Sequence, residues 1–236
     1  MWPAFPDEHM RHARISAHRT DVGCQVTALS PSPLHEAVTT DLRAAYDGSA
    51  ETRNASQRPP WQLQEREGFL ARLRSEHRRS LFEVGAGAGH DSQYFADNGL
   101  TVVATDLSPE MVVRCRARGL DAHVMDVLHL DLPTGAFDAA YAMNSLLHIP
   151  NADLPDALAA IRRSLNAGAL FYLGVYGGAE PFEGVLSSDW HVPHRFFSFR
   201  TDSQLLAVVE PHFLVEDFHV VEDHAYFQSL TLRVRA

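Results

Sequence analysis

Two kinds of apolar pattern alternate along the chain. Short, nearly continuous apolar runs occur at residues 81–84, 101–106, 122–125, 136–143 and 169–176. Amphipathic stretches with a helical period lie between several of these runs, and the clearest covers residues 154–165. Continuous apolar runs are typical of strands covered on both faces, and intervening helices connect parallel strands. The pattern predicts an α/β fold, a mostly parallel sheet with helices on both faces.

Helical patterns also precede the first apolar run. Residues 34–46 and 61–76 carry apolar positions at helical spacing, and Asp47-Gly48-Ser49 predicts a turn after the first of these helices. Two helices are therefore expected before the first strand. Residues 1–33 show no sustained periodicity, so we expect a mobile N-terminal extension there.

A long aromatic segment, residues 177–200, follows the last of the apolar runs. Long loops inside compact domains are usually functional, so we interpret this segment as an insertion that faces a substrate. Residues 201–236 then predict a helix at 201–210 and a hairpin with strands at 213–221 and 226–234.

Alternating glycines end the first run, in the order Glu83-Val84-Gly85-Ala86-Gly87-Ala88-Gly89. Glycine lets a ligand approach bare backbone, and the start of the following helix offers free N–H groups. The dinucleotide fingerprint needs a glycine at position 90, where this chain has His90. Residues 81–113 contain no Lys or Arg, so no cationic side chain in this segment could meet a phosphate. The Glu83 carboxylate suits a ligand with an ammonium group or hydroxyls. A glycine turn without a ligand is the alternative.

A second carboxylate, Asp106, ends the run Thr101-Val102-Val103-Ala104-Thr105-Asp106. An acid about 20 residues beyond a glycine turn can accept hydrogen bonds from both ribose hydroxyls of a nucleotide. Ser108 and Pro109 follow as the predicted N-cap and first residue of a helix. An acid at this place can also serve only as a turn or cap residue.

The glycine turn and the phrase Val103-Ala104-Thr105-Asp106-Leu107-Ser108-Pro109-Glu110-Met111 together resemble two motifs of class I S-adenosylmethionine (SAM)-dependent methyltransferases. The resemblance is to small-molecule enzymes with methyltransferase domains of type 11 or 25, and it covers about residues 81–178. It implies a Rossmann-like, seven-stranded, mostly parallel sheet with an antiparallel last strand. Residues 34–236 are then one SAM-binding domain, with a helical cap at 34–80 and the cofactor core at 81–176.

The resemblance also implies which residues hold SAM. Glu83 would lie near the amino group of the methionine part, and Asp126 would accept a hydrogen bond from the adenine amino group, with Asp131 as its rival. The implied cofactor residues lie in the glycine turn and at the ends of the next three strands: Glu83, Gly85, Ala86, Gly87, Gly89, Asp106, Leu107, Met111, Asp126, Val127, Met143 and Asn144.

The sequence assigns roles to the residues around the methyl acceptor less specifically than to the cofactor residues. His148 follows the fourth strand, where substrate and methyl group meet in this family, and it could act as a general base, bind substrate, or simply pack the loop. Tyr46, Arg53 and Trp61 could cover the cofactor from the cap, although Tyr46 and Trp61 could equally pack the helices down. The insertion offers Trp190, His191 and His194 as substrate-binding residues.

Composition narrows the partners. The formal net charge is −10, which disfavours nucleic acid and anionic membranes. The two cysteines, Cys24 and Cys115, form no C-x-x-C pair, so we expect neither a disulfide framework nor a metal. No apolar run is long enough to cross a membrane, and residues 1–20 lack the apolar core of a signal peptide, so we expect a cytoplasmic location. We expect a monomer or a homodimer.

The predicted function is transfer of the SAM methyl group, by in-line displacement, to an O or N nucleophile of a small organic molecule such as a secondary metabolite. Aligning the reactants and excluding water are then the protein's main tasks. Two alternatives stay open. The chain could be a non-catalytic SAM-binding subunit or regulator, or a dehydrogenase-like domain, which His90 disfavours.

Overall fold

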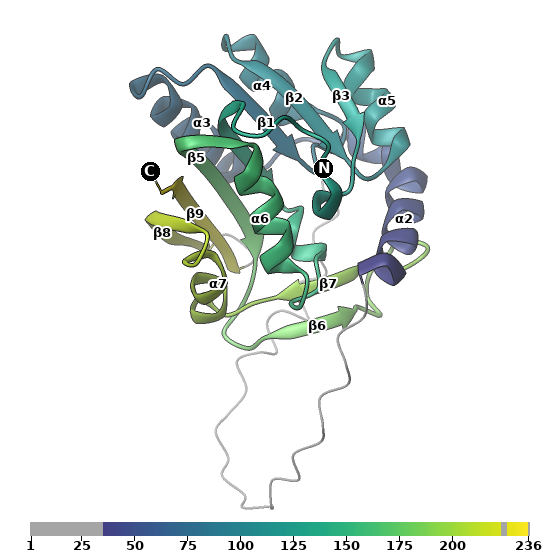
Figure 1. The fold of residues 1–236 in the computed structure, drawn as a ribbon. Coiled ribbons are helices and arrows are strands. Elements are labelled where there is room, and N and C mark those ends of the chain that lie inside the picture. The colour runs from purple at the N-terminus through teal and green to yellow at the C-terminus, as the bar shows by residue number, and fades with distance from the viewer. Residues whose placement is uncertain (1–34, 223–225, 236) are drawn as a thin grey trace, which may run out of the picture.

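The computed structural model describes residues 35–222 and 226–235 (Figure 1). The predicted extension at residues 1–33 lies outside the described residues. A seven-stranded sheet forms the centre, and helices lie in front of it and behind it (Figure 1). This arrangement confirms the predicted α/β, Rossmann-like fold class.

The sheet has the strand order β3-β2-β1-β4-β5-β9-β8. β1 to β5 pair in parallel, whereas β9 runs antiparallel to both β5 and β8. The antiparallel last strand is therefore as predicted. The strands are β1 (Ser80–Val84), β2 (Thr101–Asp106), β3 (Asp121–Val124), β4 (Phe137–Met143), β5 (Leu165–Tyr176), β8 (Phe213–Glu222) and β9 (Tyr226–Val234).

Side-chain alternation along the strands sends neighbouring residues to opposite faces. Phe82 and Ala140 lie in the hydrophobic cluster under two helices, and Leu81 and Tyr141 lie in the cluster on the other face. The first cluster packs against α6 (Leu154–Ser164) and α7 (Asp202–Val209), which stand in front of the sheet in Figure 1. The other face is covered by α3 (Pro60–Ser75), α4 (His90–Asp97) and α5 (Pro109–Ala117).

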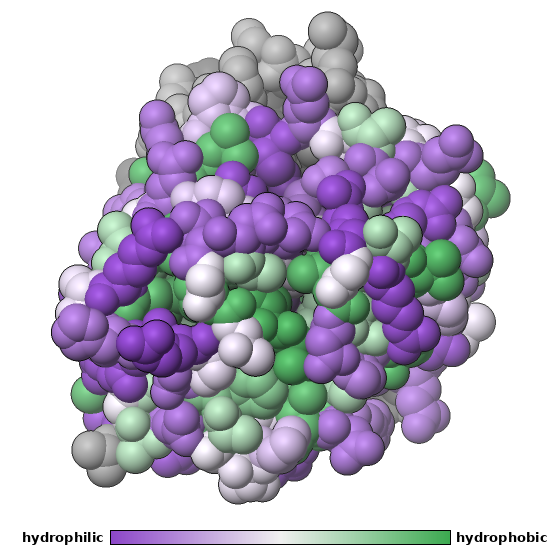
Figure 2. Space-filling model, turned by 90° about the horizontal axis from the view of Figure 1, so that it is seen from above, coloured by the Kyte–Doolittle hydropathy of each residue, from purple (hydrophilic) through white to green (hydrophobic). Residues whose placement is uncertain are grey.

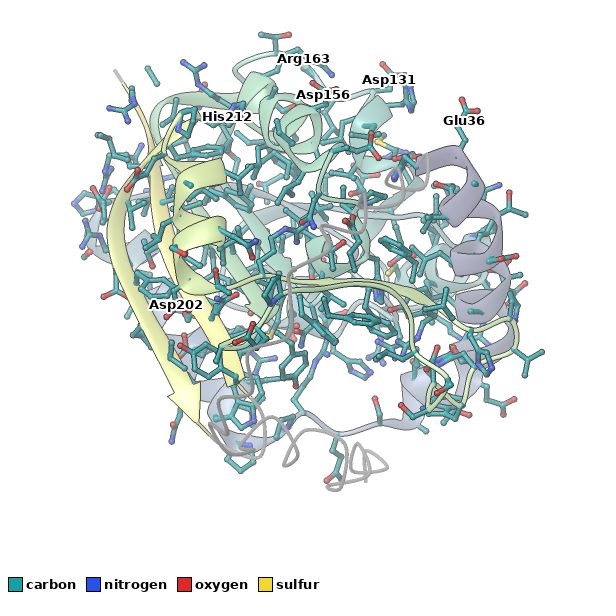
Figure 3. The ribbon with its side chains drawn as sticks, turned by 90° about the horizontal axis from the view of Figure 1, so that it is seen from below. Glu36, Asp131, Asp156, Arg163, Asp202 and His212 are labelled. Atoms are coloured by element: carbon teal, nitrogen blue, oxygen red, sulfur yellow. The ribbon has the colours of Figure 1, made fainter. Side chains whose placement is uncertain are left out.

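Two of these helices begin where the sequence predicts. The Ser108 hydroxyl accepts a hydrogen bond from the Met111 amide at 3.1 Å, so Ser108 is the N-cap of α5. Thr201 and Gln204 form a capping box at the start of α7, in which each side chain bonds the other residue's backbone N–H. Within α7, Asp202 accepts hydrogen bonds from Tyr226 and Gln228 of β9 and so ties helix to sheet (Figure 3).

The predicted turn at Asp47-Gly48-Ser49 is wrong. The first helix, α2 (His35–Ala55), continues through it for a further turn and more. Ser49 and Ala50 are buried, and Asp47 accepts hydrogen bonds from Ser108 and from the Glu110 amide. These long-range contacts outweigh the weak helix propensity of glycine.

The insertion also has more order than expected. β6 (Phe182–Val185) and β7 (Phe196–Phe199) form a separate antiparallel pair, which lies below the main sheet in Figure 1. β5 begins at Leu165, four residues before the predicted strand at 169, with an irregularity in its pairing to β4. Two short 3-10 turns, η1 (Val127–His129) and η2 (Leu146–His148), follow β3 and β4.

Candidate functional site

A pocket with about 1000 Å³ of empty space, partly open to solvent, lies at the carboxyl ends of the parallel strands. Such a position is where open α/β sheets bind ligands. Figure 3 shows the molecule from below, the side of β6 and β7, with α2 on the right. The Glu36 side chain of α2 points outward from the molecule. The walls come from α2, the segment before α3, the glycine turn and the ends of β2, β3 and β4.

The glycine turn after β1 uses left-handed backbone conformations that only glycine adopts without strain. At Gly85, with φ of 72°, an added Cβ would lie 2.3 Å from the Cβ of Ser145. At Gly87, with φ of 57°, an added Cβ would meet no atom within 4 Å. Gly85 is therefore fixed by packing against the loop after β4, whereas Gly87 leaves room for a ligand against its backbone.

Asp106 holds the glycine turn from the end of β2. One carboxylate oxygen accepts from the Gly87 amide at 2.7 Å, and the other accepts from the Ser108 amide at 2.9 Å. Burial raises the pKa of Asp106, although both amide hydrogen bonds oppose that effect. Each oxygen keeps a lone pair for a further donor, and Asp106 lines the pocket as predicted.

Glu83 lies behind the glycine turn and does not line the pocket. It accepts a hydrogen bond of 2.5 Å from Ser92, and burial, with the nearby Asp91 charge, raises its pKa to about 8. Asp91 in turn forms ion pairs with Arg58 at 2.9 Å and Arg66 at 3.0 Å. Arg58 reaches the pocket wall, so this end of the pocket presents a guanidinium.

Asp126 follows β3 and lines the pocket, and its rival Asp131 is exposed at the surface (Figure 3). His35, in the first turn of α2, donates to the two Asp126 oxygens from its Nε2 atom, which is 2.8 Å from each. Burial would raise the pKa of Asp126, but the hydrogen bonds from His35 and the Leu128 amide outweigh burial and lower it. The carboxylate is therefore ionised and closes the pocket toward α2.

Two polar atoms after β4 have no hydrogen-bond partner among the described residues. They are Oδ1 of Asn144 and Oγ of Ser145, both buried, and both residues line the pocket beside Met143. Asn144 holds a positive φ of 57°, which is uncommon outside glycine. Buried polar atoms normally have partners, so unpartnered ones in a pocket wall fit a polar ligand there.

His148 takes part in a hydrogen-bonded group between η2, α2 and the insertion. Its Nδ1 lies 2.7 Å from the Phe196 carbonyl oxygen, and its Nε2 lies 2.6 Å from the Tyr46 hydroxyl. Arg195 donates to the same Tyr46 oxygen at 3.2 Å and is itself held by Asp189 through three hydrogen bonds. Burial, and then the Arg195 charge, lower the pKa of His148 to about 3.

The structure brings most of the predicted residues to one place. Pocket-lining residues that were predicted are Gly85, Ala86, Gly87, Asp106, Leu107, Asp126, Val127, Met143, Asn144, Tyr46, Arg53 and His148. Predicted residues outside this lining are Glu83, Gly89, Met111, Trp61, Trp190, His191 and His194.

The outlying residues have other surroundings. Trp61 packs on Phe227 with ring centroids 4.6 Å apart, so it fixes α3 to the sheet. Trp190 is 54% exposed and stacks on His191, and His194 is exposed. His191 is buried and lies 2.9 Å from Asp189, so it supports Arg195 and does not reach the pocket.

Three pocket-lining residues, His35, Arg58 and Ser145, and the nearby Arg195 were not predicted from the sequence. Three of them have a partner 33 to 149 positions away in the chain: His35 with Asp126, Arg58 with Asp91 and Arg195 with Tyr46. For Arg58, the adjacent Pro59-Pro60 marks the start of α3 and could have drawn attention to it. In the described part of the chain, no group of three or more His, Cys, Asp or Glu residues could hold a metal ion.

Residues 81–168 match the family profile described as "Methyltransferase domain". Residues 81–168 therefore form a methyltransferase domain. The match starts in β1 and contains the glycine turn, Asp106, Asp126 and His148, so it spans the strand ends that form the pocket. It confirms the resemblance to class I SAM-dependent methyltransferases.

Curated relatives are similar to this methyltransferase domain over part of their length. The ubiquinone biosynthesis O-methyltransferase of Xanthomonas oryzae pv. oryzae (strain PXO99A) is 35% identical over 100 residues, which are 39% of this chain and 41% of that protein. The malonyl-[acyl-carrier protein] O-methyltransferase of Enterobacter lignolyticus is 31% identical over 106 residues, 44% of this chain and 41% of that protein. The chain thus spans about two fifths of the length of these relatives.

Solved structures share the fold of the methyltransferase domain more completely. The Burkholderia thailandensis 1,6-didemethyltoxoflavin-N1-methyltransferase, with 1,6-didemethyltoxoflavin and S-adenosylhomocysteine bound, has a TM-score of 0.69 at 21% identity and covers 88% of this chain and 93% of its own. The [4+2]-cyclase SpnF has a TM-score of 0.67 at 19% identity and covers 87% and 98%. Among the described residues, no helix has the length and apolarity needed to cross a membrane.

Proposed function

We propose that the chain is an enzyme that transfers the methyl group of SAM to an oxygen or nitrogen atom of a small organic molecule. The observation that carries this proposal is the pocket itself. Its lining combines the open Gly87 backbone, Asp106 and Asp126 with Tyr46 and His148. The methyltransferase domain in residues 81–168 and the relatives named as O-methyltransferases support it.

The residues present fit SAM. Asp106 would accept from the ribose hydroxyls, Asp126 would meet the adenine amino group, and the open Gly87 backbone would lie against the nucleoside. Arg58 would face the methionine carboxylate, and the unpartnered Asn144 Oδ1 and Ser145 Oγ would receive polar groups of the same ligand. When bound, SAM supplies an electrophilic methyl group on a positively charged sulfur.

The acceptor would enter beside Tyr46 and His148, between α2 and the insertion. The chain's task there is to align the acceptor atom and to exclude water, because methyl transfer is a single displacement. A small molecule is favoured because the pocket holds about 1000 Å³ and is flanked by α2 and by the strand ends. The toxoflavin N-methyltransferase, which shares the fold, binds a small heterocycle together with S-adenosylhomocysteine, which supports this size class.

Calorimetric titration with SAM, S-adenosylhomocysteine and NAD tests the cofactor. We expect binding of the first two and none of NAD. Asp106→Ala should lower SAM affinity at least tenfold, because a hydrogen bond to a charged group contributes roughly 1.5–3 kcal/mol. Asp131→Ala is the matched control, since Asp131 is exposed and outside the pocket lining. Equal affinities of the two variants would rule out the ribose assignment.

A second candidate reaction follows from the fold comparison. SpnF shares the fold and is described as a [4+2]-cyclase, so this fold does not by itself specify methyl transfer. Incubation of the protein with SAM labelled in the methyl group and a metabolite extract distinguishes the two. Methyl transfer predicts a labelled product with one equivalent of S-adenosylhomocysteine, whereas a cyclase or a non-catalytic binder predicts none.

A further inference from the structure

The Tyr46 hydroxyl has two hydrogen-bond partners, and both are fixed by other residues. Arg195 can only donate, and its 3.2 Å bond to Tyr46 therefore occupies one acceptor position of the phenol oxygen. Asp189 accepts hydrogen bonds from Nε and Nη2 of Arg195 and also from the Arg195 amide, so the guanidinium cannot easily turn away. The second partner is His148, at 2.6 Å.

The His148 ring fixes the direction of that second hydrogen bond. Its Nδ1 lies 2.7 Å from the Phe196 carbonyl oxygen, which can only accept, so Nδ1 carries the proton. The pKa of about 3 keeps the ring neutral at physiological pH, and Nε2 is then an acceptor without a proton. The Tyr46 hydroxyl must donate to it. The chain of donors runs from Tyr46 to His148 to the Phe196 carbonyl.

One acceptor position of the Tyr46 oxygen remains, and Tyr46 lines the pocket next to His148. We propose that Tyr46 receives the O–H group that is to be methylated, accepts its proton during transfer, and passes its own proton to His148. Tyr46 is then the catalytic residue that touches the acceptor, and His148 is a positioning residue that acts through it. This inference rests on the proposed methyl transfer.

The step conserves atoms and charge. As the acceptor atom forms its bond to the methyl carbon, its bond to hydrogen breaks toward the Tyr46 oxygen. The Tyr46 O–H bond breaks toward Nε2 of His148, and the electron pair of the carbon–sulfur bond stays on sulfur. One positive charge is lost at sulfur and one appears on the His148 ring, so the total charge of the buried pocket does not change.

A weak base is sufficient for this role. An acceptor oxygen gains positive charge as it binds the methyl group, and the proton that remains on this oxonium becomes strongly acidic. A histidine with a pKa of about 3 is never protonated beforehand at neutral pH and gives up its proton readily afterwards. The arrangement also selects the acceptor, because a phenolate or carbonyl has no hydrogen to donate to Tyr46.

Binding of chromogenic probes to the protein loaded with S-adenosylhomocysteine tests the inference without turnover. The probes are 4-nitrophenol and its methyl ether, 4-nitroanisole, which lacks the donor. Wild type should bind neutral 4-nitrophenol about five- to tenfold more tightly than 4-nitroanisole, the worth of one hydrogen bond. Tyr46→Phe should lose this preference. Tyr94→Phe is the matched control, since the Tyr94 ring lies under Arg66 outside the pocket lining.

A second readout follows the His148 ring directly. Nitrogen-15 NMR of histidine-labelled protein should show protonated Nδ1 and unprotonated Nε2 from pH 5 to 9, and Tyr46→Phe should shift the Nε2 resonance without changing the tautomer. No preference for 4-nitrophenol in wild type, tighter binding of its phenolate, or a protonated Nε2 would each overturn the inference. Failure to load S-adenosylhomocysteine would instead refute the proposed function, so the two failures are distinguishable.

Discussion

Gly85 and Gly87 are required in the glycine turn for different structural reasons. A Cβ at Gly85 would collide with Ser145, whereas a Cβ at Gly87 would enter open pocket space. Gly85→Ala should therefore unfold at clearly lower temperature than wild type. Gly87→Ala should lose only about 1–2 kcal/mol through its left-handed backbone but should lose SAM binding. Thermal unfolding and titration of both variants check this, and equal unfolding temperatures would contradict it.

Glu83 makes stability depend on pH. The unfolded chain ionises this residue near pH 4.5, whereas the folded protein holds it protonated up to about pH 8 because of burial and the Asp91 charge. Between these values the folded state binds more protons than the unfolded state, so stability falls as pH rises.

Glu83→Gln removes that dependence. The unfolding temperature of the variant minus that of wild type should increase from pH 5 to pH 8, because only wild type loses stability in keeping a buried carboxyl group protonated as pH rises. Glu210→Gln, at an exposed position at the end of α7, is the control for the exchange of glutamate for glutamine. If the difference in unfolding temperature between Glu83→Gln and wild type did not change from pH 5 to pH 8, the raised pKa of Glu83 would be contradicted.

At the scale of elements, α2 contains a glycine that packing does not require. Gly48 is exposed in the middle of the helix, and an added Cβ would meet no atom within 4 Å. Gly48→Ala should stabilise the protein by about 0.5–1 kcal/mol, because alanine loses less entropy in a helix. Chemical denaturation measures the change. Gly68→Ala in α3 has the same free space and should behave alike, and destabilisation of both would refute the reasoning.

Local signals in the sequence predicted most elements, and long-range contacts explain the rest. β2 and the N-cap of α5 were predicted as observed because period, cap residue and proline all lie within a few positions. The extension of α2 past Gly48 depends on Asp47 meeting Ser108, 61 residues away. The β6–β7 pair depends on register across a 10-residue gap that contains no simple turn signal.

The site shows the same division. The glycine turn and Asp106 could be predicted because a strand, a turn and a second strand end suffice to place them. The partners of Tyr46 could not, since His148 and Arg195 are 102 and 149 positions distant. For His148, its place after the fourth strand predicted a position near the pocket, but not that Tyr46 and the Phe196 carbonyl engage both ring nitrogens.

For the whole molecule, the negative net charge disfavours the binding of nucleic acids. The net charge is −10, and on the face seen from above, away from β6 and β7, hydrophilic residues surround hydrophobic ones near the middle (Figure 2). We expect no salt-sensitive binding to RNA or DNA oligomers, because such binding needs a basic surface. Fluorescence anisotropy with labelled oligomers at several salt concentrations checks this. A micromolar complex at physiological salt would refute it.

Helix α2 contacts the pocket lining at two places, through His35 on Asp126 and through Tyr46 on His148. These two residues are eleven positions apart, on the order of 16 Å along one helix. A movement of α2 that exposes the cofactor would therefore also separate Tyr46 from the acceptor. An acceptor with two methylatable groups should leave between rounds, so singly methylated product should accumulate before doubly methylated product appears. Time-resolved mass spectrometry would reveal a processive enzyme instead if both methyl groups arrived in one encounter.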